Sequence, residues 1–130
     1  MTTPLWAILF LLFIPLLLAF TSDYFRIKQF GKFDNNNPRI QSAGLTGVGQ
    51  RAWAAQQNAW EAIILYAPAA LVAHVVGADA QQSAQAALLY CGARVLHALF
   101  YLLDLDKLRS LSFLVALGCV LWLFWLAGTA

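Results

Sequence analysis

The sequence predicts an all-α membrane protein, with a single domain of residues 1–130 folded as a four-transmembrane-helix up-down bundle. Hydrophobic residues make up 62% of the chain and charged residues 11%, and the mean hydropathy is +0.68. Soluble domains are only about half apolar and about a quarter charged. Four apolar segments, roughly 4–20, 52–77, 84–103 and 108–127, have lengths near the ~20 residues that cross a bilayer. Short connections make neighbouring helices antiparallel.

The first segment, 4–20, begins at Pro4 and contains Pro15. Proline suits the first turn of a helix, where the backbone N–H has no partner, and it kinks a helix from inside. A cleaved signal peptide is the alternative interpretation. The segment lacks both the basic residues and the A-x-A-like cleavage site of such peptides, so we expect a spanning helix.

The only long polar connection follows, from Thr21 to Gln50. Its "DNNNPRI" stretch at Asp34–Ile40 predicts a turn, because Asn side chains bond the local backbone and Pro38 fixes its own φ. Its glycine-rich "AGLTGVGQ" stretch has two interpretations. It either aims backbone amides at an anion before the next helix or is a loop resting on the membrane surface.

The second segment, 52–77, is polar in its first three turns and apolar afterwards. A soluble amphipathic helix is disfavoured because the latter half, "AIILYAPAALVAHVVG", is apolar on all faces. The third and fourth segments, 84–103 and 108–127, each contain one cysteine, Cys91 and Cys119. We interpret both as small packing residues, and a disulfide between them stays open. No spacing of Cys and His residues predicts a metal site.

The basic residues predict the orientation of the chain in the membrane. They lie in or beside the first and third connections, and only one lies inside a segment: Arg26, Lys28, Lys32, Arg39 and Arg51, then Lys107 and Arg109, with Arg94 inside. The positive-inside bias therefore places both connections in the cytoplasm and both termini on the non-cytoplasmic side of a multi-pass integral membrane protein. The net charge of +2 is small, and the basic residues do not cluster into a patch, so we predict no nucleic-acid partner.

Polar side chains inside the second and third segments are the candidate functional residues, because a charge at mid-bilayer costs about 2.5–3.5 kcal/mol. Asn58 and Glu61 share a face of the second segment, with Arg51 two turns earlier. The third segment carries a stripe of Tyr90, Arg94, His97 and Tyr101.

Two interpretations of these residues are open. In the first, Glu61 and Arg94 form a closed pair with hydrogen-bonded Asn58 and Tyr90, and serve only helix association. In the second, they line a polar pocket that opens toward the cytoplasm and holds a small charged ligand. The set is larger than one ion pair needs, and Arg51, Tyr101 and Arg109 approach the same end, which favours the pocket.

Three stretches of the sequence stand together as a pattern: "NPR" at Asn37–Arg39, "RAWAAQQNAWEA" at Arg51–Ala62 and "ARVLHALFYLLDLDKLRS" at Ala93–Ser110. This pattern resembles the MAPEG family, the membrane-associated proteins in eicosanoid and glutathione metabolism. With the four segments, the resemblance covers nearly the whole chain. The R-x-x-H-x-x-x-Y run is especially similar to the prostaglandin-synthase branch, and the compact length resembles small bacterial members, which implies the bacterial inner membrane.

The resemblance implies a homotrimer in lipid, with glutathione bound as substrate or cofactor between subunits near the cytoplasmic face. It places the glutathione contacts at Asn58, Glu61, Arg94, His97 and Tyr101, and the catalytic residues at Arg109, Ser110 and Tyr101. Arg109 would stabilise the thiolate. By its chemistry Arg51 is expected to bind glutathione as well, through a carboxylate.

Two functions follow as hypotheses. The first is a glutathione-dependent membrane transferase or peroxidase that acts on a lipophilic small-molecule electrophile. The second is a non-catalytic trimeric scaffold or lipid-binding protein that retains the fold. Ala54 motivates the second, because several glutathione-using members carry an arginine at that position. A transporter is a weaker third option, since no discontinuous helix pair or inverted repeat is present.

Overall fold

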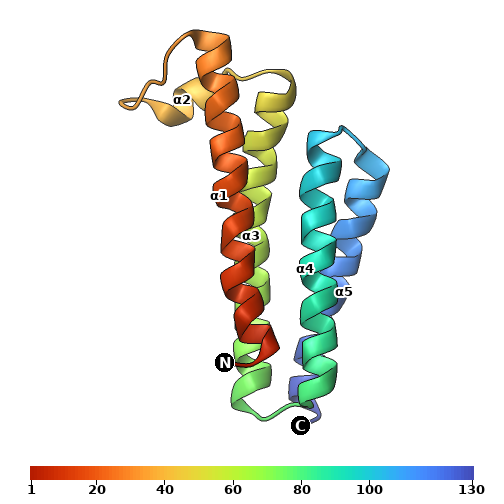
Figure 1. The fold of residues 1–130 in the computed structure, drawn as a ribbon. Coiled ribbons are helices and arrows are strands. Elements are labelled where there is room, and N and C mark those ends of the chain that lie inside the picture. The colour runs from red at the N-terminus through yellow and green to blue at the C-terminus, as the bar shows by residue number, and fades with distance from the viewer.

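The computed structural model describes all of residues 1–130 as five helices without strands: α1 (Thr3–Phe30), α2 (Pro38–Ala43), α3 (Gly47–Val75), α4 (Ala80–Leu102) and α5 (Asp106–Gly128). The four long helices run alternately up and down (Figure 1). Both termini lie at one end of the molecule, whereas α2 and the α4–α5 turn lie at the other (Figure 1). The alternation follows from the short α3–α4 and α4–α5 connections.

Three of these helices, α1, α3 and α5, are long and apolar enough to cross a membrane. The chain is therefore an integral membrane protein. Helix α4 has 23 residues, about 35 Å at 1.5 Å per residue, which is also long enough. Its polar residues lower its hydropathy: Gln81, Gln82, Gln85, Arg94 and His97. That α4 crosses the membrane too stays a prediction.

Helix α1 continues well past the predicted span, which ended at residue 20. It begins with Pro4 in its first turn, accommodates a buried Pro15, and ends at Gly31, whose φ of 77° allows its N–H to donate to the Ile27 carbonyl. Its buried face continues through Ser22 and Arg26 into the predicted polar connection. The helix is longer than its apolar segment because apolar residues are needed only inside the bilayer. Beyond the bilayer, the helix continues for as long as one of its faces packs against the rest of the chain.

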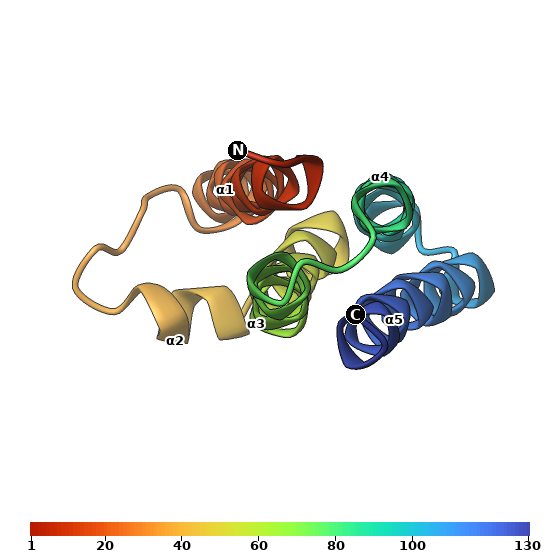
Figure 2. The same ribbon diagram turned by 90° about the horizontal axis from the view of Figure 1, so that it is seen from below.

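The long helices pack so that two of them occupy the centre. Helices α3 and α4 contact each other, α1 contacts both of them, and α5 also contacts both, but α1 and α5 do not meet (Figure 2). The core between them is rich in alanine: Ala7, Ala62, Ala69, Ala70, Ala73, Ala86, Ala87, Ala93 and Ala116. Small side chains let helix backbones approach closely, which is how packing stabilises helix pairs in lipid.

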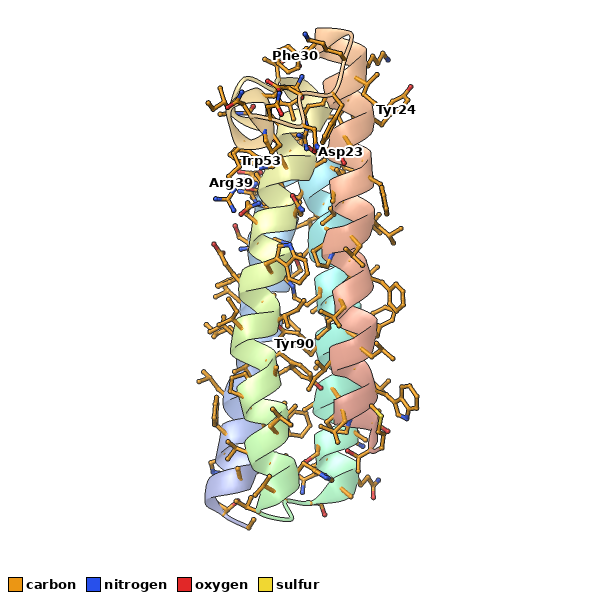
Figure 3. All side chains as sticks on the ribbon, turned by 90° about the vertical axis from the view of Figure 1, so that its left-hand side faces the viewer. Asp23, Tyr24, Phe30, Arg39, Trp53 and Tyr90 are labelled. Carbon is orange, nitrogen blue, oxygen red and sulfur yellow. The ribbon has the colours of Figure 1, made fainter.

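Two tyrosines are the only fully buried aromatic residues of this core. Tyr66 and Tyr90 stack with ring centroids 4.5 Å apart. The Tyr66 hydroxyl donates to the Pro4 carbonyl over 3.1 Å, and the Tyr90 hydroxyl donates to the Ala62 carbonyl over 2.7 Å. Figure 3 shows Tyr90 at mid-height in the bundle. The hydroxyls of both tyrosines are therefore satisfied, as burial in the interior of a membrane protein requires.

The two cysteines are free thiols, and both contribute to the same core. Cys119 is buried and Cys91 is partly buried. This arrangement agrees with the predicted packing role and contains no disulfide.

The connection between α1 and α3 is an ordered cap. Arg26 pairs with Asp23, donates to the Pro38 carbonyl over 3.3 Å, and lies 4.6 Å from the centre of the Phe33 ring. The turn predicted at Asp34–Ile40 is confirmed for residues 34–37, where the Asp34 carboxylate accepts the N–H groups of Asn36 and Asn37, but it is wrong for Pro38–Ile40, which form the start of α2. Figure 3 shows this cap at the upper end of the bundle, where Asp23 and Arg39 lie.

Candidate functional site

Two adjoining hollows open on the face formed by α3, α4 and α5. We call them the lower hollow, of about 180 Å³, and the upper hollow, of about 380 Å³. The lower hollow is lined by Asn58, Glu61, Ala62, Leu65, Tyr90, Arg94, Phe113, Ala116, Leu117 and Val120. The upper hollow is lined by Asn58, His97, Tyr101, Arg109, Ser110, Phe113 and Leu114. Asn58 and Phe113 belong to both, so the two hollows meet at these side chains.

Hydrogen bonds from α4 to the α3 backbone hold the lower hollow in place. Tyr90 donates to the Ala62 carbonyl, and one turn along each helix the Arg94 Nη2 atom lies 3.3 Å from the Asn58 carbonyl. The same Nη2 atom also lies 2.7 Å from the Asn58 side-chain oxygen. A guanidinium that is only 3% exposed therefore has fixed acceptors on the facing helix.

Glu61 does not bond Arg94 directly. The only ion pairs in the structure are Arg26–Asp23 and Arg51–Asp104, so Arg94 has no carboxylate within 4.0 Å. Asn58 connects the two residues instead, since its amide nitrogen lies 3.3 Å from the Glu61 carboxylate. The closed Glu61–Arg94 pair of the first interpretation is thus absent, and Glu61 stays exposed at the edge of the lower hollow.

The upper hollow contains a stack of one imidazole, one phenol ring and one guanidinium. The His97 and Tyr101 rings meet edge to face at 5.7 Å, and the Arg109 guanidinium lies 4.4 Å from the centre of the Tyr101 ring. Such a cation–π contact orients a guanidinium while leaving its N–H donors free. His97 is 4% exposed, and its Nδ1 atom has no hydrogen-bond partner.

The charges around the two hollows leave an excess of one positive charge, from Arg94 and Arg109 against Glu61. Polar groups gather where the hollows meet and toward the α4–α5 turn. The far end of the lower hollow is apolar, lined by Leu65, Leu117 and Val120. The site can therefore hold an anionic ligand that also carries an ammonium group, beside an apolar molecule.

The structure brings together every predicted site residue except Arg51. Asn58, Glu61, Arg94, His97, Tyr101, Arg109 and Ser110 all line one of the two hollows. Arg51 lines neither. Its Nε atom donates to the Leu102 carbonyl over 3.2 Å, and its Nη1 atom lies 3.8 Å from the Asp104 carboxylate.

Sequence reasoning missed Phe113, which both hollows share. It lies four residues after Arg109 and so on the same face of α5, a spacing that marks it as a neighbour. Asp104, the partner of Arg51, was also missed. No local signal distinguishes it from Asp106, because only the fold shows which carboxylate faces α3.

A model of the MAPEG family matches residues 3–129 of the chain. Comparison with curated proteins and with solved structures gave no match. The family match covers all four long helices and every residue that lines the two hollows.

Proposed function

This chain belongs to the MAPEG family, and from that premise we propose that it is a glutathione-dependent membrane transferase or peroxidase for lipophilic electrophiles. One observation carries the proposal. The hollows at the junction of α3, α4 and α5 gather two guanidiniums, one carboxylate, an imidazole and two phenols beside an apolar groove. Packing alone does not need so many polar groups inside a membrane protein.

The charges of the site complement those of glutathione, which has two carboxylates, one ammonium and a thiol. Arg94 and Arg109 are suited to carboxylates or the thiolate through charge-assisted hydrogen bonds. Glu61 is suited to the ammonium, since its carboxylate is exposed and accepts only one hydrogen bond, from Asn58. Glutathione would thus complete the hydrogen bonds of residues that lipid cannot satisfy.

The chemistry proposed for Arg109 is stabilisation of the thiolate. A free thiol has a pKa of about 8.5, and the thiolate is the nucleophile. Each unit by which the pKa falls needs about 1.4 kcal/mol of preferential interaction with the anion. Ser110 and Tyr101 line the same hollow and offer hydroxyl donors to the sulfur.

In the transferase reaction the thiolate sulfur forms a bond to an electrophilic carbon, and the bond to the leaving group breaks with its electron pair. In the peroxidase reaction the sulfur attacks a hydroperoxide, and the O–O bond breaks to give an alcohol. A second glutathione then displaces water from the oxidised sulfur and forms the disulfide. The apolar end of the lower hollow suits the hydrocarbon part of either substrate, which would arrive through the lipid.

We further propose that α4 is the fourth span and that the protein is a homotrimer, with glutathione between subunits near the cytoplasmic face. The exposure of Glu61, Leu65 and Phe113 on one face of a single chain supports a covering neighbour. An ionised carboxylate facing lipid is unfavourable by about 2.5–3.5 kcal/mol. A second subunit would remove Glu61 from lipid and close the open side of both hollows.

The direct test is conjugation of glutathione to a model electrophile by the detergent-solubilised protein. We expect Arg109→Ala and Glu61→Ala to lower kcat/KM by about tenfold to a hundredfold, the loss of one or two hydrogen bonds to charged groups. Lys107→Ala is the matched control, because Lys107 is an exposed cation one half-turn away that lines neither hollow. Unchanged activity in both site variants would refute these roles.

The second candidate function, a non-catalytic trimeric scaffold or lipid-binding protein, is favoured by Ala54 and Ala55, which stand where several glutathione-using members carry an arginine. Thermal unfolding with and without glutathione separates the two. A ligand at 100 times its dissociation constant stabilises the folded state by about 2.7 kcal/mol. No shift at millimolar glutathione would favour the scaffold.

A further inference from the structure

We propose that Arg51 is a positioning residue, which fixes the α4–α5 turn and through it the relative placement of Tyr101 and Arg109. The inference rests on the proposed function for its catalytic consequence, although the structural part stands alone. Its observation is that the Arg51 guanidinium reaches from α3 to two acceptors in that turn and to neither hollow.

The turn itself is a tight helix end. Asp104 has a φ of 61°, its N–H donates to the Tyr101 carbonyl over 3.3 Å, and the Leu105 N–H donates to the Phe100 carbonyl over 2.9 Å. This pattern closes a helix through a left-handed residue, which is usually glycine. Asp104 is the only non-glycine residue with positive φ in the chain. Its conformation therefore depends on contacts that favour it.

Arg51 supplies such contacts. Leu102 is the last residue of α4, and its carbonyl is one of the acceptors that lack a backbone partner at a helix end. No backbone N–H from the following turn donates to it. Arg51 Nε donates to that carbonyl over 3.2 Å, while Nη1 lies 3.8 Å from the Asp104 carboxylate. No other side chain from outside α4 and α5 forms a hydrogen bond or ion pair with this turn.

The turn connects the two residues whose separation matters for the thiolate. Tyr101 lies in the last turn of α4, and Arg109 lies in the first turn of α5, where its N–H donates to the Leu105 carbonyl over 2.9 Å. Their contact of 4.4 Å therefore spans the turn that Arg51 holds. If the turn moves, the guanidinium moves relative to the phenol and to any sulfur bound between them.

The alternative role for Arg51 is a direct bond to a glutathione carboxylate. A ligand contact made equally in the ground and transition states changes KM and leaves kcat unchanged. A positioning residue changes kcat and the pH dependence of the reaction, because it displaces the group that stabilises the thiolate. It also changes the turn in the absence of any ligand.

The experiment is a double-mutant cycle of Arg51→Ala and Asp104→Asn in the solubilised full-length protein. Asparagine tolerates the left-handed conformation, so Asp104→Asn removes the charge and keeps the turn. Amide hydrogen exchange over residues 100–109 without ligand is the first readout. We expect Arg51→Ala to accelerate exchange there by about tenfold or more, since each tenfold step corresponds to 1.4 kcal/mol.

Glutathione conjugation is the second readout. We expect Arg51→Ala to lower kcat by about tenfold and leave KM for glutathione within about twofold, as a displacement of ~1 Å can cost up to 10²-fold. The pH midpoint of kcat should rise. The double variant should be no worse than Arg51→Ala alone, because the one ion pair that Asp104→Asn removes is already lost in Arg51→Ala. Arg51→Lys should recover less than half of the loss, since an ammonium lacks the planar fork.

If amide hydrogen exchange over residues 100–109 is unchanged in Arg51→Ala, the proposal is wrong, whatever the activity of the variant. A raised KM with unchanged kcat and exchange would make Arg51 a ligand contact and also overturn it. If the wild type neither binds nor conjugates glutathione, the proposed function fails, whereas faster amide exchange in Arg51→Ala would still establish that Arg51 holds the turn.

Discussion

At the scale of single residues, the central feature is a buried cation that is held by an amide rather than by a carboxylate. Arg94 donates to two oxygen atoms of Asn58, and Asn58 donates to Glu61. A direct ion pair would neutralise both charges and leave neither for a ligand. The amide keeps the two charges apart and leaves the carboxylate at the open edge of the lower hollow.

This arrangement predicts that Asn58 matters for stability as well as for binding. Asn58→Ala removes the 2.7 Å hydrogen bond and leaves a buried guanidinium short of an acceptor. Hydrogen bonds to charged groups contribute about 1.5–3 kcal/mol, so we expect a loss of that size in the free energy of unfolding. Denaturant unfolding in detergent measures it.

Gln57→Ala is the control for this change, because Gln57 is the exposed neighbour of Asn58 and makes no side-chain hydrogen bond. We expect its effect to stay within about 0.5 kcal/mol. An equal effect of the two substitutions would show that the Arg94–Asn58 bond does not stabilise the fold.

Arg109 predicts a pH dependence. A guanidinium favours the anionic thiolate over the neutral thiol, so in the proposed role Arg109 would lower the thiol pKa of bound glutathione below the free value of about 8.5. Activity should then rise with pH through that lowered pKa. In Arg109→Ala the midpoint should move upward toward about 8.5, which kcat measured from pH 5.5 to 9.5 will show. A midpoint that does not move would exclude Arg109 from the environment of the thiolate.

Residue types, spacing and the family resemblance together predicted residues that the fold gathers around the two hollows. Seven of the eight predicted residues line the hollows: helical spacing places Asn58 beside Glu61, and Arg94 in line with His97 and Tyr101, whereas Ser110 was expected from the resemblance alone. The eighth, Arg51, is a cation at the same end of the bundle as the upper hollow, but it does not line either hollow. Its bonding partners depend on the height at which the α4–α5 turn meets α3, which no local pattern encodes.

At the scale of helices, packing decides where an element ends and hydropathy does not. The apolar segments identified each long helix, but α1 extends to Phe30, beyond the predicted end of its span at Phe20. The extension packs through Ser22 and Arg26, which are buried and polar. A polar buried face outside the bilayer resembles a loop in sequence, so this part of the fold was not predictable from hydropathy.

A close approach at the start of α3 secures this extension. A Cβ atom on Gly49 would lie 2.7 Å from the Cβ of Phe25 in α1 and 3.0 Å from the Leu45 side chain. Gly49→Ala should therefore force α1 and α3 apart and destabilise the protein by about 1–3 kcal/mol, the usual effect of overpacking. Thermal unfolding in detergent measures the difference.

The matched control is Gly92→Ala, since a Cβ atom at Gly92 in α4 would meet nothing within 4 Å. Alanine is the better helix former by up to about 1 kcal/mol, so this variant should be as stable as the wild type or more so. Equal destabilisation by both alanines would contradict the close α1–α3 contact.

At the scale of the whole molecule, one helix, α1, only packs against the central pair, whereas α3, α4 and α5 line the candidate site. Helices α1 and α5 lie on opposite sides of the central pair and do not meet (Figure 2). Helix α1 packs the back of α3 and α4, and the hollows open between α3 and α5 on the other side. A subunit that leaves its site open along one face is suited to a partner that closes it, which agrees with the proposed trimer.

Whether α4 crosses the membrane determines the topology of the whole chain. If all four long helices span, the N- and C-termini lie on the same side, as their common end of the bundle in Figure 1 requires. If only α1, α3 and α5 span, the termini lie on opposite sides.

The test is cysteine labelling from each side of the membrane. We expect the single variants Thr2→Cys and Thr129→Cys, each in a Cys91→Ala/Cys119→Ala background, to react with a membrane-impermeant maleimide from the same side. Cysteines that replace Asn36 and Lys107 should react only from the other side, which the positive-inside bias predicts to be the cytoplasm. Labelling of the two termini from opposite sides would leave α4 outside the set of spans, and the Arg94 stripe would then need a different environment from the one proposed.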